Sequence, residues 1–398
     1  MKSDKSVVPR SRHILIFEPR LGGHHLSWLR YVIEDLLAGG FVLTVVADLR
    51  PRAKDLVVEH LSDLLDSINL VSAYGEDGAY RSGSKTKTLV ACLRECGADH
   101  VLFTNFDEVA SNWLRLAAFG IYPPEILRGK LSGVYFRPRF FENSFWPLGN
   151  LIKMIGFRRL CRGKWFQNFY FLDEYLVSRA KSCQWARYGS SFHFLPDAWS
   201  GDFSKDKEIA RKALGIPADK FVFLNYGIGT RRKGLHLVIK ALRKGTMPKR
   251  AFLLCAGSIA DDRELLEGTN DLVKKGIAKV LNRYVSDAEE ELCFAACDVV
   301  LLPYVKHFGS SGVLSMSSAA GKMVIASDEG LLGRRVRSGD LGLLFRSKNS
   351  KSLIDVMHKA LSLSNTDLIR YRESALRHAD TCSREAFRSV FLKSFRNL

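Results

Sequence analysis

The sequence lacks any run of 18 or more apolar residues. A transmembrane helix needs about 20 such residues in a row, so no segment predicts a membrane span. The opening segment, MKSDKSVVPRSRH, carries charge but has no apolar stretch of the kind found in signal peptides. We therefore expect a cytoplasmic protein that does not cross the membrane.

Cysteine is scarce, and its spacing does not indicate a metal site. Eight cysteines form no C-x-x-C pair, and Cys92/Cys96 and Cys293/Cys297 share the i,i+4 spacing of one helical face. This favours buried thiols in a reducing compartment over zinc ligands or disulfides. No Asp-x-Asp pair follows an expected strand either. We expect no metal and no other cofactor.

The charge balance is strongly basic. Sixty Lys and Arg against 42 Asp and Glu give a formal net charge of +18, which permits nucleic-acid binding. The chain has no zinc-finger spacing and no aromatic strand of the RNA-binding type, so we expect no nucleic-acid partner.

Basic and aromatic residues concentrate between residues 128 and 199. This segment has 12 Lys and Arg, 4 Asp and Glu, and 18 of the 43 aromatic residues of the chain. The combination suits docking on an anionic membrane surface, where rings and basic groups are both favoured. The alternative is that the rings belong to a domain core and the charges form a solvated face. The rings concerned are Phe140, Phe141, Phe145, Trp146, Phe157, Trp165 and Phe166.

The order of apolar segments predicts an α/β fold. Strands are expected at 13–17, 41–47 and 100–104, with a helix over 53–65 and another after the first strand. Alternating strands and helices indicate a parallel sheet covered on both faces. A length of 398 residues with 46% hydrophobic residues supports two such domains, with a hinge at 195–205.

Loops at the carboxyl ends of the first domain's strands carry candidate ligand-binding groups, because ligands bind at that edge of such sheets. The acceptor candidates are Asn105, Asp107, Glu108 and Arg137, preceded in the chain by Gly22, Gly23, His24 and His25. Either histidine can position an acceptor or relay its proton, or can simply start a helix. The carboxylates are candidates for an acceptor anchor or base, or for a helix cap.

Two phosphate-type loops follow strands in the second half of the chain. The first, after the strand at 221–226, contains Gly227, Gly229, Arg231, Arg232, Lys233 and Gly234. The second, after DVVLLPYV, contains Ser310, Ser311, Gly312 and Val313. A strand that turns through small residues into a helix presents free N–H groups and the positive end of the helix dipole. Two such turns beside three basic residues suit a diphosphate, although a solvated turn and a helix cap are the plainer interpretations.

The ordered series LPDAWSGDF, RKALGIPADKFVFLNYGIGTRRKG, RYVSDAEEELCFAACDVVLLPYV and AAGKMVIASDEGLLGRRVRSGDLGLLF resembles the donor domain of GT-B glycosyltransferases, specifically the retaining glycosyl transferases group 1 family. The resemblance implies two Rossmann-like domains that face each other across a cleft. Residues 1–195 would bind the acceptor and residues 206–366 the nucleotide sugar. Residues 367–398 would form a helix that returns to the N-terminal domain.

The resemblance also implies roles for single residues. Lys233 matches the lysine of the family's RKG turn and Arg232 the basic residue before it, so both would neutralise the leaving diphosphate. The loop from Ser310 to Gly312 would bind that diphosphate. Gly22 and Gly23 match the glycine-rich loop beside the donor phosphates, and a group formed by His24, His25 and Asp107 would guide the acceptor hydroxyl.

The sequence departs from the family pattern in three places. The paired glutamates, separated by seven residues, are absent from 307–309 and from Ser315/Met316. Gly227 and Ile228 stand where the family often has Gly-Arg, and Arg231 is the candidate for the missing charge. After the strand that ends before Arg137, the family's histidine is also absent.

These features predict a metal-independent hexosyltransferase that uses a UDP- or GDP-linked sugar. The resemblance implies that its acceptor is a glycan or a lipid-linked sugar in surface polysaccharide or glycolipid synthesis, and that anomeric configuration is retained. We expect the protein to be peripheral on the inner face of the cell membrane. The alternative is a catalytically inactive, nucleotide-binding scaffold or partner subunit, for which the missing glutamates argue.

Overall fold

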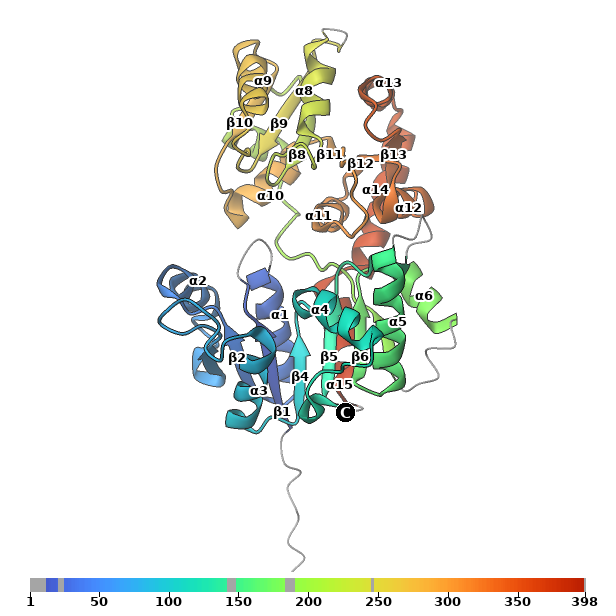
Figure 1. Ribbon diagram of the computed structural model, residues 1–398. Helices are drawn as coiled ribbons and strands as arrows, with labels where there is room; N and C mark the ends of the chain where they lie inside the picture. The colour runs from blue at the N-terminus through green and yellow to red at the C-terminus, as the bar shows by residue number, and fades with distance from the viewer. Residues whose placement is uncertain (1–11, 21–24, 142–147, 183–189, 245–246, 397–398) are drawn as a thin grey trace, which may run out of the picture. The chain divides into compact units, whose positions relative to one another are not determined.

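The protein was analysed as a computed structural model that describes residues 12–20, 25–141, 148–182, 190–244 and 247–396. The chain divides into two compact units. The first comprises Met1–Leu195 and Arg388–Leu398, and the second comprises Pro196–Phe387. Each unit contains one parallel sheet flanked by helices (Figure 1).

The sheet of the first unit has seven strands in the order β3-β2-β1-β4-β5-β6-β7. Its strands are β1 (His13–Glu18), β2 (Val42–Ala47), β3 (Asn69–Ser72), β4 (His100–Phe103), β5 (Leu131–Tyr135), β6 (Phe166–Phe171) and β7 (Ser191–Phe194). Its helices are α1 (His25–Ala38), α2 (Pro51–Leu61), α3 (Lys85–Cys96), α4 (Asp107–Ala118), α5 (Leu148–Arg162) and α6 (Glu174–Ser182), with short 3-10 turns η1 (Leu65–Ser67), η2 (Glu125–Leu127) and η3 (Arg139–Phe141). The expected strands are β1, β2 and β4. The order reverses between β1 and β4, as in Rossmann folds.

The sheet of the second unit has six strands in the order β10-β9-β8-β11-β12-β13. Its strands are β8 (Phe221–Tyr226), β9 (Ala251–Ala256), β10 (Ala278–Leu281), β11 (Val299–Leu302), β12 (Met323–Ser327) and β13 (Gly342–Phe345). Its helices are α7 (Lys207–Ala213), α8 (Leu235–Arg243), α9 (Arg263–Lys274), α10 (Asp287–Ala296), α11 (Gly312–Ala319), α12 (Gly330–Ser338), α13 (Ser350–Leu361) and α14 (Asn365–Thr381). Here the order reverses between β8 and β11.

The C-terminal segment consists of two helices. α14 packs against α11 in the second unit. α15 (Arg384–Arg396) belongs to the first unit from Arg388 onward. There the ring of Phe391 stacks on that of Tyr170 at 4.9 Å between centroids, and the hydroxyls of Tyr170 and Ser394 share a hydrogen bond of 2.5 Å. The chain end is therefore anchored to β6.

Strand alternation builds the two cores of the second unit. Phe223, Leu253 and Leu301 face one layer of helices, whereas Val222, Leu254 and Val300 face the other. Successive side chains of a strand point to opposite faces, so a sheet buried on both sides needs continuous apolar strands. The seven described cysteines are free, and all except the partly exposed Cys96 are buried.

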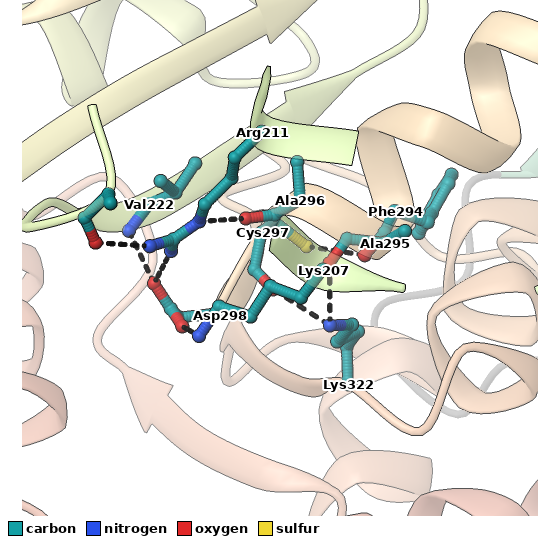
Figure 2. Close-up of polar contacts among 10 residues, drawn as sticks. Lys207, Arg211, Val222, Phe294, Ala295, Ala296, Cys297, Asp298 and Lys322 are labelled. Atoms are coloured by element: carbon teal, nitrogen blue, oxygen red, sulfur yellow. Dashed lines mark hydrogen bonds and ion pairs between the residues drawn. The ribbon is translucent and has the colours of Figure 1, made fainter. Parts of the chain in front are cut away.

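A carboxylate fixes the amino edge of the second sheet (Figure 2). Asp298, directly before β11, accepts hydrogen bonds from Arg211 Nη2 at 2.7 Å and from the backbone N–H of Val222 at 2.7 Å. Lys207 also donates to it. Arg211 is buried and donates to the carbonyl oxygen of Ala296 as well. This network joins α7, β8 and β11 at the edge opposite the candidate site.

The aromatic residues of the basic segment belong mainly to the first core. Phe140, Phe141, Phe157, Trp165 and Phe166 are all buried, in a cluster of rings around Phe106 and Phe169. Phe145 and Trp146 lie outside the described residues. The described rings therefore follow the core alternative rather than the membrane interpretation. No helix in the described part of the chain is long and apolar enough to cross a membrane.

Candidate functional site

The candidate site of the second unit lies where β8 and β11 end, at the reversal of strand order. In open parallel sheets, ligands bind beyond the carboxyl ends of the strands at this point. The turn after β8 and the loop after β11 are joined by a hydrogen bond of 2.8 Å from the Val305 N–H to the carbonyl oxygen of Arg232. The two phosphate-type loops recognised in the sequence are therefore neighbours.

Lys233 occupies the centre of this pair of loops. Its backbone N–H donates to Thr230 Oγ1 at 3.0 Å, and its Nζ lies 5.8 Å from the centre of the Tyr304 ring. A β-carbon at Gly227 would lie 2.7 Å from Nζ, so the ammonium lies against the strand end. Burial, assisted by the charge of Arg232, lowers the pKa of Lys233 to about 8. A partly desolvated ammonium of this kind interacts strongly with an arriving anion.

Arg232 is linked to the second loop through His307. Its Nη1 lies 3.2 Å from His307 Nδ1, and His307 Nε2 lies 3.0 Å from the carbonyl oxygen of Ser310. A carbonyl only accepts and a guanidinium only donates, so these contacts require the tautomer protonated at Nε2. His307 thereby holds Arg232 beside the loop that precedes α11.

The start of α11 brings Ser310 and Ser311 to the same place. Arg335 of α12 donates to Ser310 Oγ at 2.8 Å, and Ser311 Oγ donates to the hydroxyl of buried Tyr304 at 3.3 Å. The first amides of an α-helix, here from Gly312 and Val313, have no acceptor within the helix. Amides in this position can bind an anion, and that role for Gly312 and Val313 stays a prediction.

Two of the predicted donor residues contact a different loop. Arg231 forms ion pairs with Asp262, at 2.6 Å, and with Glu264. Gly229 pairs its backbone with Ser258 and Ala260 after β9. The structure thus brings together Gly227, Arg232, Lys233, Ser310 and Ser311, and places Arg231 and Gly229 toward β9.

The sequence did not single out Thr230, Tyr304 or Arg335. Thr230 and Tyr304 lie within the two loops, so the sequence could have indicated that they are close to Lys233. Arg335 lies 25 positions after Ser310 in the chain. The arginines of its helix are spaced as in many exposed helices, so the local sequence does not indicate that Arg335 contacts the site.

The candidate residues of the first unit gather at the carboxyl ends of β4 and β5. Asp107 begins α4 and accepts hydrogen bonds from the backbone N–H groups of Phe136, at 2.8 Å, and Arg137, at 3.1 Å. Burial raises the pKa of Asp107 to about 6, against the lowering effect of these bonds. Asp107 therefore joins the loops that follow β4 and β5.

Glu108 and Asn105 lie beside Asp107. Glu108 is ion-paired with Arg20 at 2.7 Å and with Lys85 at 2.6 Å, neither of which the sequence singled out. Asn105 is only 7% exposed, and its Oδ1 has no hydrogen-bond partner within the described part of the chain. Gly22, Gly23 and His24 lie outside the described residues. His25 begins α1, and its side chain also lies outside the described part.

The second unit has a recognisable counterpart among known families. Residues 206–375 match the family described as Glycosyl transferases group 1. The match makes this part of the chain similar to a glycosyl transferases group 1 domain. Lys233 and the start of α11 both lie within the matched residues.

Comparison with a curated relative covers part of the chain. D-inositol 3-phosphate glycosyltransferase of Corynebacterium urealyticum is 30% identical over 200 residues, which are 48% of this chain and 46% of the relative. The chain thus matches about half the length of this relative.

Solved structures match over nearly the whole chain. A glycosyltransferase from Rickettsia africae has a TM-score of 0.66 at 14% identity, covering 98% of this chain and 100% of the other. HepE of Anabaena, in complex with UDP and glucose, has a TM-score of 0.65 at 16% identity, covering 97% and 100%. With the two parallel sheets, these likenesses confirm the expected GT-B fold of two Rossmann-like domains, the second of which contains the group 1 match.

Proposed function

We propose that this protein is a glycosyltransferase that moves a sugar from a nucleoside diphosphate sugar to an acceptor hydroxyl. The observation that carries the proposal is the position of the Lys233 ammonium. It is partly buried next to Arg232, in a turn that is bonded to the loop before α11, at the strand ends where a group 1 domain is expected to bind its donor. Partly desolvated cations and helix amides together suit a diphosphate.

The chemistry asked of these groups is stabilisation of a leaving group. When the bond from the anomeric carbon to the phosphate oxygen breaks, negative charge develops on the diphosphate. Lys233 and Arg232 neutralise this charge, and the amides of Gly312 and Val313 donate to its oxygens. Because His307 holds Arg232 in place before the donor arrives, little reorganisation is needed as the charge develops.

The acceptor side is assigned to the first unit. We propose that Asp107, with His24 and His25, guides the attacking hydroxyl, and that Asn105, Glu108 and Arg137 contribute to acceptor binding. A carboxyl with a pKa of about 6 is mostly ionised at neutral pH and is close enough to neutrality to exchange a proton. Its two backbone hydrogen bonds set its orientation.

We further propose a UDP- or GDP-linked hexose as donor, a glycan or lipid-linked acceptor, and retention of configuration. The complex of HepE with UDP and glucose favours UDP. The cationic side chains and helix amides supply positive charge at the leaving group without a divalent metal. Activity in excess EDTA should therefore equal activity in its absence, and strict dependence on added Mg²⁺ or Mn²⁺ would contradict this assignment.

We also propose a membrane-facing role for α5 in the first unit. Leu148, Leu151 and Ile155 are exposed, the first of them at 72%, on the same helical stripe as Arg158 and Arg162. Apolar residues followed by arginines on one face suit an anionic bilayer surface. We propose this stripe as the peripheral contact. Leu148→Asp with Leu151→Asp should abolish sedimentation with anionic vesicles, and unchanged sedimentation would exclude the stripe.

The function is tested by release of UDP or GDP from a panel of nucleotide sugars, with membrane extract as acceptor source. Wild-type protein should release one nucleotide, and Lys233→Ala should reduce the rate at least about 100-fold, as for loss of one charge-stabilising group. Lys240→Ala is the matched control, because Lys240 is an exposed lysine of α8, the helix that follows the Lys233 turn. Nucleotide binding without release from any donor would favour the inactive scaffold.

A further inference from the structure

A cluster of basic and tyrosine side chains lies at the carboxyl edge of the first sheet. It comes from the segments that follow β1, β2 and β3, which are neighbours in the sheet. The members are Arg20, Arg50, Tyr74, Tyr80 and Lys85. Lys85 is also the first residue of α3. The function proposed above makes this edge the acceptor side but gives these five residues no role.

The charges of this cluster are layered. Glu108, with its side chain 5% exposed, accepts from Lys85 and Arg20 at once, whereas the side chain of Arg20 is 63% exposed. Asp48 is buried likewise, and both of its oxygens accept from the more exposed Arg50, at 2.9 and 2.6 Å. The carboxylates lie beneath and the cations lie outermost. A solute that approaches this edge therefore meets positive charge first.

The two tyrosines hold the cations in place. The guanidinium of Arg50 lies 4.1 Å above the ring of Tyr74, which is 4.7 Å from the ring of Tyr80. Lys85 Nζ lies 5.8 Å from the Tyr80 ring on the same cluster. The Tyr74 hydroxyl is bonded to that of Tyr80 at 3.1 Å. Stacking and ion pairing together remove much of the rotamer freedom that ordinarily weakens surface charges, so the cations are preorganised.

A second observation at this edge indicates a ligand with a hydroxyl group. Asn105 follows β4, which pairs with β1, and it is only 7% exposed. Among the residues that the structure describes, none donates a hydrogen bond to its Oδ1. An unsatisfied buried acceptor destabilises the fold, and an O–H donated by a bound molecule would remove this cost. The backbone N–H of Glu108, whose side chain holds the cations, bonds to the Asn105 carbonyl oxygen at 3.3 Å.

We propose that the acceptor is a hydroxyl compound that carries a phosphate-type anion, seated on Arg20, Arg50 and Lys85, with a hydroxyl bound by Asn105. This inference rests on the proposed function only in treating the ligand as the acceptor. The anion belongs either to a soluble phosphate ester or to the headgroup of a lipid. Both present the same charged oxygens to the cluster.

The test is calorimetric titration with glucose 6-phosphate and with glucose, at saturating UDP so that the donor loops are filled. Wild-type protein should bind the phosphate ester at least tenfold more tightly than the uncharged sugar. The double variant Arg20→Gln/Arg50→Gln should lose this preference. Arg128→Gln is the matched control, because Arg128 has similar exposure and is likewise paired with a carboxylate, Glu125, but precedes β5 at the other edge of the sheet.

A second arm separates the two sources of the anion. Binding to phosphatidylcholine vesicles that contain phosphatidic acid is measured for the wild type and for the double variant. Both proteins keep α5 unchanged. Binding that falls in the double variant identifies a lipid headgroup, whereas a preference seen only with glucose 6-phosphate identifies a soluble ester. No preference in either arm, or one that the double variant retains, overturns the proposal. Lysine-dependent UDP release can persist in that case, so the proposed function is judged separately.

Discussion

A β-carbon at Gly234 would lie 1.8 Å from the carbonyl oxygen of Pro303. The turn after β8 therefore touches the loop after β11 at a point where no side chain fits. Gly234 also has φ of 77°, a left-handed conformation that strains any residue with a β-carbon. The close approach of the two phosphate-type loops depends on this one glycine.

Gly234→Ala should destabilise the second unit by about 3 kcal/mol or more, because steric overlap adds to backbone strain. The free energy of unfolding, obtained from denaturant titration, measures the loss. Gly276→Ala is the control, since Gly276 has φ of 67° but nothing within 4 Å of the added carbon. It should lose only about 1 kcal/mol. Equal losses would show that the contact with Pro303 is unimportant.

Lys233 should make nucleotide binding depend on pH. With a pKa near 8, the free side chain is mostly protonated at pH 7 and loses its charge as the pH rises beyond 8. The Kd for UDP should then increase by up to about tenfold per pH unit, because binding requires uptake of the lost proton. Calorimetry between pH 7 and pH 10 measures this. The same rise in Lys233→Ala would assign the titration to another group.

Arg211→Met should lower the free energy of unfolding by about 3 kcal/mol, because it leaves the carboxylate of Asp298 without its buried partner. Lys207→Met removes the more exposed partner of the same carboxylate and should cost less than about 1 kcal/mol. Denaturant midpoints of the two variants provide the comparison. Similar losses would mean that burial does not distinguish the two ion pairs.

His100 should make the first unit labile to acid. Burial lowers the pKa of His100 to about 3, below its ordinary value of 6.5, so the folded protein keeps it neutral while the unfolded chain takes up a proton. Stability is then lost as the pH falls from about 6.5 toward 3, by up to about 1.4 kcal/mol per pH unit. In His100→Gln, thermal unfolding followed over this range should show a shallower slope. An unchanged slope would exclude His100 as the source.

The strands and the β8 turn were predictable from local patterns. Apolar runs such as FVFLNY mark strands whose two faces are both buried, and glycines next to basic residues mark the turn that follows. Contacts between distant segments had no such signal. The link from Arg335 to Ser310 and the pairing of Lys85 with Glu108 depend on the order of strands, which periodicity does not encode.

The aromatic segment shows how composition misleads where spacing informs. Phe157, Leu160 and Cys161 are buried while Arg158, Arg159 and Arg162 are exposed, so the last turns of α5 have an apolar face and a basic face. A count of aromatic and charged residues over the 72 positions from 128 to 199 does not distinguish the buried face of α5 from its exposed face. Three- and four-residue spacing separates them and assigns Phe157 to the core.

The closeness of Gly227 to the Lys233 ammonium has a consequence for how the donor loops can be altered. The absence of a side chain at position 227 lets the Lys233 ammonium approach the end of β8. One added methyl group would move the positive charge outward into water, where its pull on an anion is weaker. Because Gly227 also has φ of 88°, any larger residue would strain the backbone as well, so glycine at this position keeps both the turn and the short distance from the ammonium to the strand end.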